Sequence, residues 1–212
     1  MKRLLAAAVP AALLLAACVT PQVAVNPRAD FSKIHRVAVV TFGGPQGDVA
    51  ADLLTQSLVA YGANVVERQQ LSAVLQEQHL GSSGVLDPST LAQLGRILGV
   101  DAIFVGTVAQ SMPEQSYMVT TPDQAVVNTV TPVSSGSVYA GGPVMGVPNS
   151  QVVTTAAAVS IVGRLVDVTT GSVLWSASMS YEGYDVPSAM RGVTDAFVQS
   201  LVPIWPELIA KK

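Results

Sequence analysis

The order in which strand-like and helix-like segments alternate constrains the fold of this chain more than any other feature. Residues 36–42 form a β-branched run closed by two glycines, which is typical of a buried strand. Asp48 caps an amphipathic stretch that ends at Gly62, and a second strand-like segment at 63–67 follows directly. Strand, helix and strand in this order indicate the start of an α/β domain.

The same alternation continues toward the C-terminus. Helical spacing of apolar residues predicts two further helices, at 68–80 and 87–99, and a buried strand at 101–108. Two alternating segments, 158–168 and 173–181, are separated by a short turn and predict a hairpin. We therefore expect an α/β fold.

The C-terminal end of the chain carries one more helical pattern. Pro187 and Ser188 start it, and Pro203 and Pro206 interrupt the chain after it. Residues 208–212 are predicted to be a tail.

The segment 111–155 differs from the rest of the chain. It is rich in Pro, Gly, Ser, Thr and Val, has no helical period, and contains only two charged residues, Glu114 and Asp123. A loop of this length without structure is uncommon in a compact domain. The segment is therefore expected to be an insertion that serves as a functional element, a disordered arm or an extended hairpin.

The N-terminus has the pattern of a secretory signal peptide over residues 1–17. Lys2 and Arg3 precede an apolar run of about 14 residues, and small residues follow just before Cys18. The run is shorter than the roughly 20 residues that a spanning helix needs. Residues 18–33 contain two prolines and no helical period, so we expect an extended tether, with the folded domain over 34–212.

Leu15-Ala16-Ala17-Cys18 resembles the bacterial lipobox, which implies lipidation of Cys18 and cleavage before it. Cys18 is the only cysteine, so no internal disulfide is expected. Several acyl chains on one residue give a stable membrane anchor. By the sorting rule of such lipoproteins, Val19 in place of an aspartate implies the outer membrane.

The charge of the chain argues against a nucleic-acid partner. Without residues 1–17 the chain holds 9 basic and 14 acidic residues, and nucleic-acid surfaces need the opposite balance. Charged residues make up 12% of the full sequence, well below the usual quarter, which is consistent with a surface partly covered by partners.

Groups for catalysis are sparse. His35 and His79 are predicted at a strand edge and on a helix face, and both are interpreted as structural. No metal-ligand spacing is present, and Gly43-Gly44 lacks the further glycine and lysine of a phosphate-binding loop. The sequence therefore predicts a protein that is not an enzyme, with no cofactor and no metal.

Several segments together resemble the family of the curli-secretion lipoprotein CsgG. They lie within residues 37–108 and 158–179, and Glu67-Arg68 followed by Glu77-Gln78 is the most distinctive part. The resemblance implies a mixed sheet flanked by helices in a periplasmic domain. The curli member forms a ring whose hairpins build a secretion pore, without a bound cofactor.

This chain departs from the curli protein in the hairpins. The first of the two hairpin positions holds 111–155, but at the second, residues 182–187 lead directly into the last helix. Pro122, Asp123, Pro143 and Pro148 interrupt the apolar alternation that a spanning strand needs. A membrane hairpin, a contact arm and a disordered loop remain open for 111–155, and a contact arm or loop in the periplasm is favoured.

Two functional hypotheses follow. The first is an oligomeric, non-enzymatic outer-membrane lipoprotein that serves secretion or assembly of cell-surface structures. The second is a periplasmic regulator that binds a cell-wall synthase, like the lipoprotein activators of penicillin-binding proteins. The second would act as a monomer through its tether, which at about 15 residues spans at most some 50 Å.

Overall fold

The computed structural model describes residues 20–66, 93, 95–120, 138–143 and 150–209. Several predictions lie outside these residues. They are the signal peptide 1–17, lipidation of Cys18, the helix at 68–80 with His79, and the pairs Glu67-Arg68 and Glu77-Gln78.

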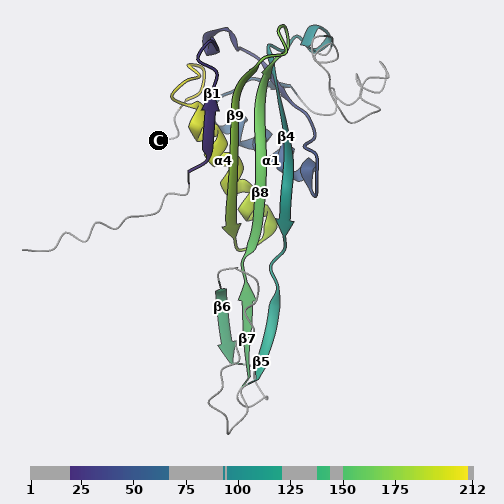
Figure 1. Cartoon of the computed structure of the whole chain (residues 1–212), viewed down its shortest axis with the longest axis vertical. Coiled ribbons are helices and arrows are strands. Elements are labelled where there is room, and N and C mark those ends of the chain that lie inside the picture. Colours follow the sequence, from purple (N-terminus) through teal and green to yellow (C-terminus); the bar gives the residue numbers. More distant parts are fainter. Residues whose placement is uncertain (1–19, 67–92, 94, 121–137, 144–149, 210–212) are drawn as a thin grey trace, which may run out of the picture.

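The domain is built on a six-stranded mixed sheet in the order β1-β9-β8-β4-β2-β3 (Figure 1). Its strands are β1 Gln22–Val25, β2 Val37–Val39, β3 Val65–Val66, β4 Ala102–Met112, β8 Ala157–Asp167 and β9 Val173–Gly183. β2 runs parallel to β3 and β4, whereas β4, β8, β9 and β1 pair antiparallel in succession. The predicted α/β fold with a mixed sheet is confirmed.

Two helices, α1 Gly47–Ala60 and α4 Val186–Leu201, pack on each other and cover the same face of the sheet. α1 ends at Gly62 (φ +91°), as predicted. The prediction that Asp48 is its N-cap is wrong. The chain turns through left-handed backbone at Gln46, so the helix begins at Gly47 and Asp48 lies in its first turn. A carboxylate there still interacts favourably with the helix dipole.

α4 starts where Pro187 and Ser188 predicted, and Asp185 is its N-cap. The Asp185 carboxylate accepts a hydrogen bond from the Ser188 backbone N–H, while the Ser188 hydroxyl accepts one from the Asp185 N–H. This reciprocal arrangement satisfies two backbone donors that would otherwise lack a partner at the helix start.

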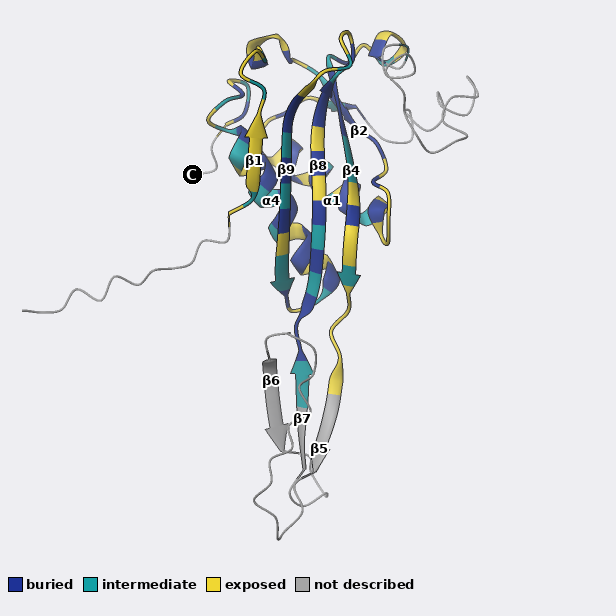
Figure 2. Ribbon diagram, in the orientation of Figure 1, coloured by how far each residue is buried: buried dark blue, intermediate teal, exposed yellow. Residues whose placement is uncertain are grey.

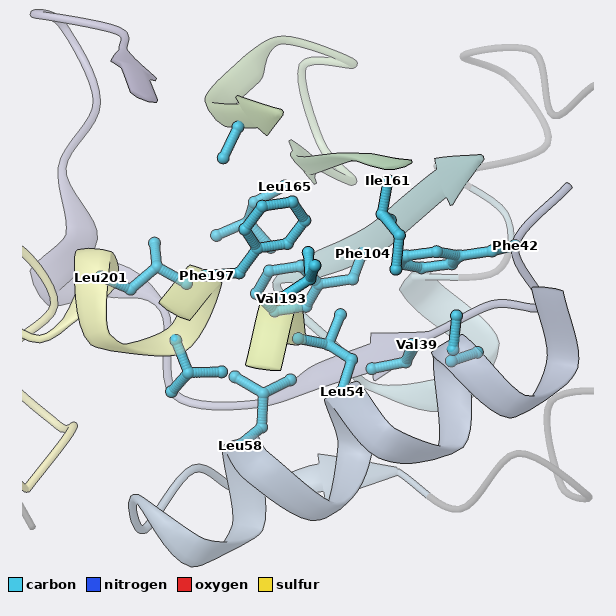
Figure 3. Close-up of a cluster of buried hydrophobic side chains, with 14 of the residues drawn as sticks. Val39, Phe42, Leu54, Leu58, Phe104, Ile161, Leu165, Val193, Phe197 and Leu201 are labelled. Carbon is cyan, nitrogen blue, oxygen red and sulfur yellow. The ribbon is translucent and has the colours of Figure 1, made fainter. Parts of the chain in front are cut away.

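The main core lies between the sheet and the helices. Figure 3 shows large apolar side chains from both layers pointing toward one another, including Phe104 and Leu165 of the sheet, Leu54 of α1 and Phe197 of α4. The Trp175 ring meets Phe104 and Phe197 edge to face, with centroids 6.2 and 5.5 Å away. Such pairs add about 0.5–1.5 kcal/mol each beyond burial.

A smaller cluster covers part of the opposite face, at the β2, β3 and β4 side of the sheet. Its buried residues are Ala38, Val40, Val66, Val100, Ile103, Val166 and Val168. Residues 95–98 are helical, and Leu98 packs on this cluster, in agreement with the predicted helix at 87–99 where it is described.

Part of the predicted tether belongs to the sheet. β1 is extended, as expected, but it pairs with β9, placing Gln22 opposite Ser178 and Val25 opposite Trp175. Phe31 further along is buried in the main core. The prolines that suggested a tether flank this four-residue strand without interrupting its backbone pairing.

The predicted tail at 208–212 is also packed where it is described. Leu208 is buried, and the Ile209 N–H donates to the Tyr61 carbonyl. Just before it, the buried Trp205 indole N–H donates to the Ile34 carbonyl over 2.9 Å. Residues 203–209 therefore close the core beside the end of α1.

The hairpin predicted at 158–181 is present as β8 and β9. Trp175, Ala177 and Met179 are buried on one face, as the alternation predicted. Val173 is 41% exposed, because a bulge shifts the pairing so that Leu165 faces Trp175 but the next residue, Val166, faces Val173.

None of the helices in the described part of the chain is long and apolar enough to cross a membrane.

Candidate interaction site at the arm end of the sheet

The insertion predicted at 111–155 contains a second sheet. Its strands are β5 Ser116–Thr120, β6 Val138–Pro143 and β7 Ser150–Thr155, in the order β5-β7-β6 with antiparallel neighbours. We call these three strands the arm. Figure 1 shows the arm projecting from one end of the large sheet.

The arm is continuous with two strands of the domain. β4 extends to Met112, four residues beyond the predicted strand, and leads into β5 through residues 113–115, while β7 leads directly into β8. At the joint, the Thr155 N–H donates to the Gln115 carbonyl over 2.8 Å, and the Thr155 hydroxyl accepts from the Gln115 N–H over 3.1 Å. These bonds fix where the arm begins.

The arm strands contain no charged residue. Within the described structure, the strongest element contacts of the arm are those among its own strands. The described part of the arm is therefore a small uncharged sheet of its own.

The end of the large sheet from which the arm projects is called the arm end here. Across it, Met112 of β4 pairs with Ala158 of β8, and Ala158 pairs with Glu182 of β9. Tyr184 follows β9 and is 67% exposed, and Met112 is 40% exposed. Figure 2 shows exposed residues where β4 leaves the sheet toward the arm.

Acidic residues stand next to Met112 and Tyr184 in the sequence. Glu114 lies just past Met112, and Glu182 and Asp185 flank Tyr184. Hydrogen bonding with Ser188, through its side chain first and its backbone N–H second, lowers the pKa of the Asp185 carboxyl below its ordinary value of 3.8. Asp185 is therefore ionised at neutral pH, and the exposed Arg191 in α4 is the nearest base along the chain.

The predicted structural role of His35 agrees with its contacts. Its Nδ1 contacts Glu207 Oε1, and its backbone N–H donates to Asp101 Oδ2 over 2.8 Å. The hydrogen bond and charge of Glu207, with a smaller effect of Asp101, raise the pKa of His35 above 6.5. His35 thus joins the C-terminal segment to the start of β2.

A shallow open pocket of about 410 Å³ lies between the loop after β1 and the C-terminal segment. It is lined by Val25, Asn26, Pro27, Ala29, Asp30, Phe31, Ser32, Ile204 and Pro206. Its one carboxylate, Asp30, already accepts hydrogen bonds from Ser32 and pairs with Lys33. Among the described residues, no group of three or more His, Cys, Asp and Glu could hold a metal ion.

Fold and site together define an α/β protein with a mixed sheet, with α1 and α4 on one face, and with an uncharged arm. Part of the chain also matches the family that its sequence resembles. Residues 17–116 match the family model described as "Curli production assembly/transport component CsgG", so the resemblance is confirmed. The match includes all of 37–108 and ends before the hairpin at 158–179.

Solved structures are similar over most of the chain. They include the PelC dodecamer from Paraburkholderia phytofirmans (15% identity, 90% of this chain and 99% of that chain, TM-score 0.45). The lipoprotein GNA1162 from Neisseria meningitidis (16%, 79% and 95%, TM-score 0.42) and the LpoB C-terminal domain from Escherichia coli (16%, 73% and 88%, TM-score 0.41) are also similar. At these TM-scores the likenesses carry no functional argument. No curated protein matches in sequence.

Proposed function

We propose that this chain is an outer-membrane lipoprotein, acylated at Cys18 and facing the periplasm. We further propose that it acts without catalysis, as a homo-oligomeric component of secretion or assembly of cell-surface structures. The observation that carries the proposal is the position of β1, which enters the sheet only four residues after Cys18. Such a short spacer keeps the whole domain close to the membrane.

The same spacing disfavours a regulator that reaches a distant partner. The predicted tether of about 15 residues would span some 50 Å, whereas four residues span at most roughly 14 Å. Using residues 22–33 as a tether would require β1 to leave β9 and Phe31 to leave the core. A synthase bound through this chain would therefore have to lie at the same membrane surface.

A common membrane also restricts how copies can assemble. All copies anchored in one leaflet have the same orientation relative to the membrane normal. A twofold contact that pairs β1 with a second β1 antiparallel would point the two arms in opposite directions. Head-to-tail contacts around an axis normal to the membrane avoid this, and they close into rings.

The edges of the large sheet are compatible with a head-to-tail contact. Among the described strands, β1 and β3 are the two edges, and they run in opposite directions, so pairing between copies would be antiparallel. β1 is exposed throughout and carries no charge, although charges commonly protect free edges from pairing. This edge supports the homo-oligomer.

The first experiment measures the mass of the native complex extracted from membranes in mild detergent, together with the mass of the N-terminal peptide. We expect an acylated Cys18 and a complex of several copies. The Val23→Glu variant should yield monomers, because it places a charge on the β1 edge. Val59→Glu on the exposed side of α1 is the matched control, since Val59 is 56% exposed, and it should leave the mass unchanged.

The anchor and the oligomer can each be overturned by this experiment, and the role in export by removing the chain from cells. An unmodified Cys18 in membrane-extracted protein would contradict the lipoprotein. A monomer for the unsubstituted chain, in detergent and after crosslinking in intact membranes, would contradict the oligomer. Unaltered surface structures and secreted products in cells that lack the chain would contradict the role in export.

A further inference from the structure

The point at which the chain enters the sheet determines which end of the domain can reach a bilayer. Gln22 begins β1 and pairs with Ser178 in β9, and β9 continues for five residues from there to Gly183 at the arm end. Because β1 is antiparallel to β9, the chain before Gln22 comes from the arm side (Figure 1). The arm and the anchored terminus thus lie toward the same end.

The length of the spacer sets the level of the membrane. If the spacer continues along β9 in the β1 register, Cys18 comes level with Glu182. The stretch from Cys18 to Gln22 and the stretch of β9 from Ser178 to Glu182 each advance by four residues, so each measures roughly 14 Å at 3.3–3.6 Å per residue. An acylated Cys18 lies at the lipid headgroups, so the headgroups can meet the arm end without displacement of β1.

The arm end carries the side chains that a bilayer surface accepts. Tyr184 is 67% exposed and Met112 is 40% exposed, at the ends of β9 and β4. Tyrosine is enriched at membrane interfaces, because its ring is apolar and its hydroxyl stays in contact with water. Ile209 is also highly exposed, but its N–H donates to Tyr61, just before β3. There Val65 pairs with Val37, beside the start of β4 and away from Met112.

We propose that the arm end rests on a zwitterionic phospholipid surface, with Tyr184 and Met112 as its contacts. The choice of lipid follows from charge, since Glu114, Glu182 and Asp185 lie close to the two contacts in the sequence and would be repelled by anionic headgroups. This proposal rests on the proposed function in that it takes Cys18 as the point of attachment.

The single cysteine permits a test that does not depend on native acylation. The chain from Cys18 to Lys212 is coupled through Cys18 to a maleimide lipid in phosphatidylcholine vesicles, and a soluble reference is capped with N-ethylmaleimide. Backbone hydrogen exchange is then compared between the two forms. We expect peptides that include 110–116 and 182–188 to exchange several-fold more slowly on vesicles. Peptides over 159–165 and 203–209 should exchange equally in both forms.

Variants and lipids sharpen the result. Tyr184→Ser combined with Met112→Ser should remove the slowing at 182–188, and Ile209→Ser should not. Replacing part of the phosphatidylcholine by phosphatidylglycerol should weaken the slowing. Strongest protection over 159–165 would mean that the open face of the sheet lies on the lipid, and equal exchange everywhere would mean that no face does. Either outcome overturns the proposal.

This result is separate from the fate of the proposed function. Acylation of native Cys18 is read from its mass, whereas the vesicle test uses a synthetic linkage. An anchored protein without protection at the arm end would leave the lipoprotein intact and contradict only the lipid contact.

Discussion

His35 connects two parts of the chain that are far apart in sequence. Its imidazole contacts Glu207 in the C-terminal segment, while its backbone N–H donates to Asp101 at the start of β4. The side chain is 67% exposed, so solvent screens the ion pair. We therefore expect this contact to affect the pKa of His35 more than the stability of the domain.

The first prediction concerns this pKa. Because folding raises the pKa of His35 above 6.5, the ion pair stabilises the fold fully below pH 6.5. That contribution is lost as the pH rises through the folded-state pKa. The variant Glu207→Gln should lower the His35 pKa toward 6.5, measured by NMR titration of the imidazole. An unchanged pKa in this variant would show that Glu207 does not form the pair in solution.

Gly44 and Gly43 are adjacent but differ in what a side chain would meet. At Gly44, φ is +86° and an added Cβ would lie 2.1 Å from the Val108 carbonyl oxygen, a backbone atom of β4. At Gly43 the nearest atom is Thr107 Oγ1 at 3.6 Å, an ordinary contact distance. Substitutions at Gly44 and Gly43 therefore separate the effect of a constrained backbone from the effect of lying next to β4.

The second prediction uses this pair. Gly44→Ala should reduce the free energy of unfolding by more than about 2 kcal/mol, through strained backbone and displacement of β4. Gly43→Ala should change it by less than about 1 kcal/mol, as is usual for a substitution without steric conflict. Urea unfolding followed by circular dichroism measures both values. Equal losses in the two variants would contradict the constraint at Gly44.

At the scale of elements, the arm is separate from the hydrophobic packing of the domain. Neither of the two hydrophobic clusters contains a residue of β5, β6 or β7. β4 and β8 remain paired up to Met112 and Ala158, at the point where the arm leaves the sheet. The domain is therefore expected to fold without the arm.

The third prediction is the result of removing it. Replacing residues 113–156 by a short loop with Asn and Gly converts β4 and β8 into a hairpin. The midpoint of urea unfolding should stay nearly the same, because both hydrophobic clusters keep all their members. The matched control replaces only 121–137 with a loop of the same kind. Loss of cooperative unfolding in the first variant alone would show that the arm strands stabilise the domain.

Elements with a buried face could be predicted from the sequence. The period of apolar residues located α1, α4, β8 and β9, because one face of each packs on the core. β1 was missed for the opposite physical reason. It is exposed along its whole length and held by backbone pairing with β9, so no side-chain pattern marks it.

The candidate site could be predicted only in part. Low charge and many prolines marked 111–155 as a distinct insertion, but they do not determine strand order or where the arm joins the sheet. The sequence did not indicate Tyr184 and Met112 as site residues, because they form a site only through their shared position at one end of the sheet. That position follows from the pairing of β4, β8 and β9.

At the scale of the whole molecule, the proposed acylation of Cys18 would make the spacer before β1 the link between the membrane and the fold. Four residues leave little freedom, and β1 is held along β9 by four paired positions. In a chain anchored at Cys18, the spacer would therefore limit the distance from lipid to domain, and the proposed contact of Tyr184 and Met112 with lipid depends on that distance. Changing the spacer alone separates the two effects.

The fourth prediction is that lengthening the spacer releases the arm end from the lipid. Ten Gly and Ser residues inserted between Val19 and Thr20 lengthen the spacer to about 14 residues, whose root-mean-square length is about 21 Å, beyond the roughly 14 Å limit of the native spacer. In the vesicle-coupled chain, hydrogen exchange over 182–188 should return toward the rate of the soluble form. Unfolding in urea should be unchanged. Replacing Val19 and Thr20 by Gly and Ser without added length is the control and should keep the protection. Full protection in the lengthened chain would mean that the arm end binds lipid on its own, independently of where the chain is anchored.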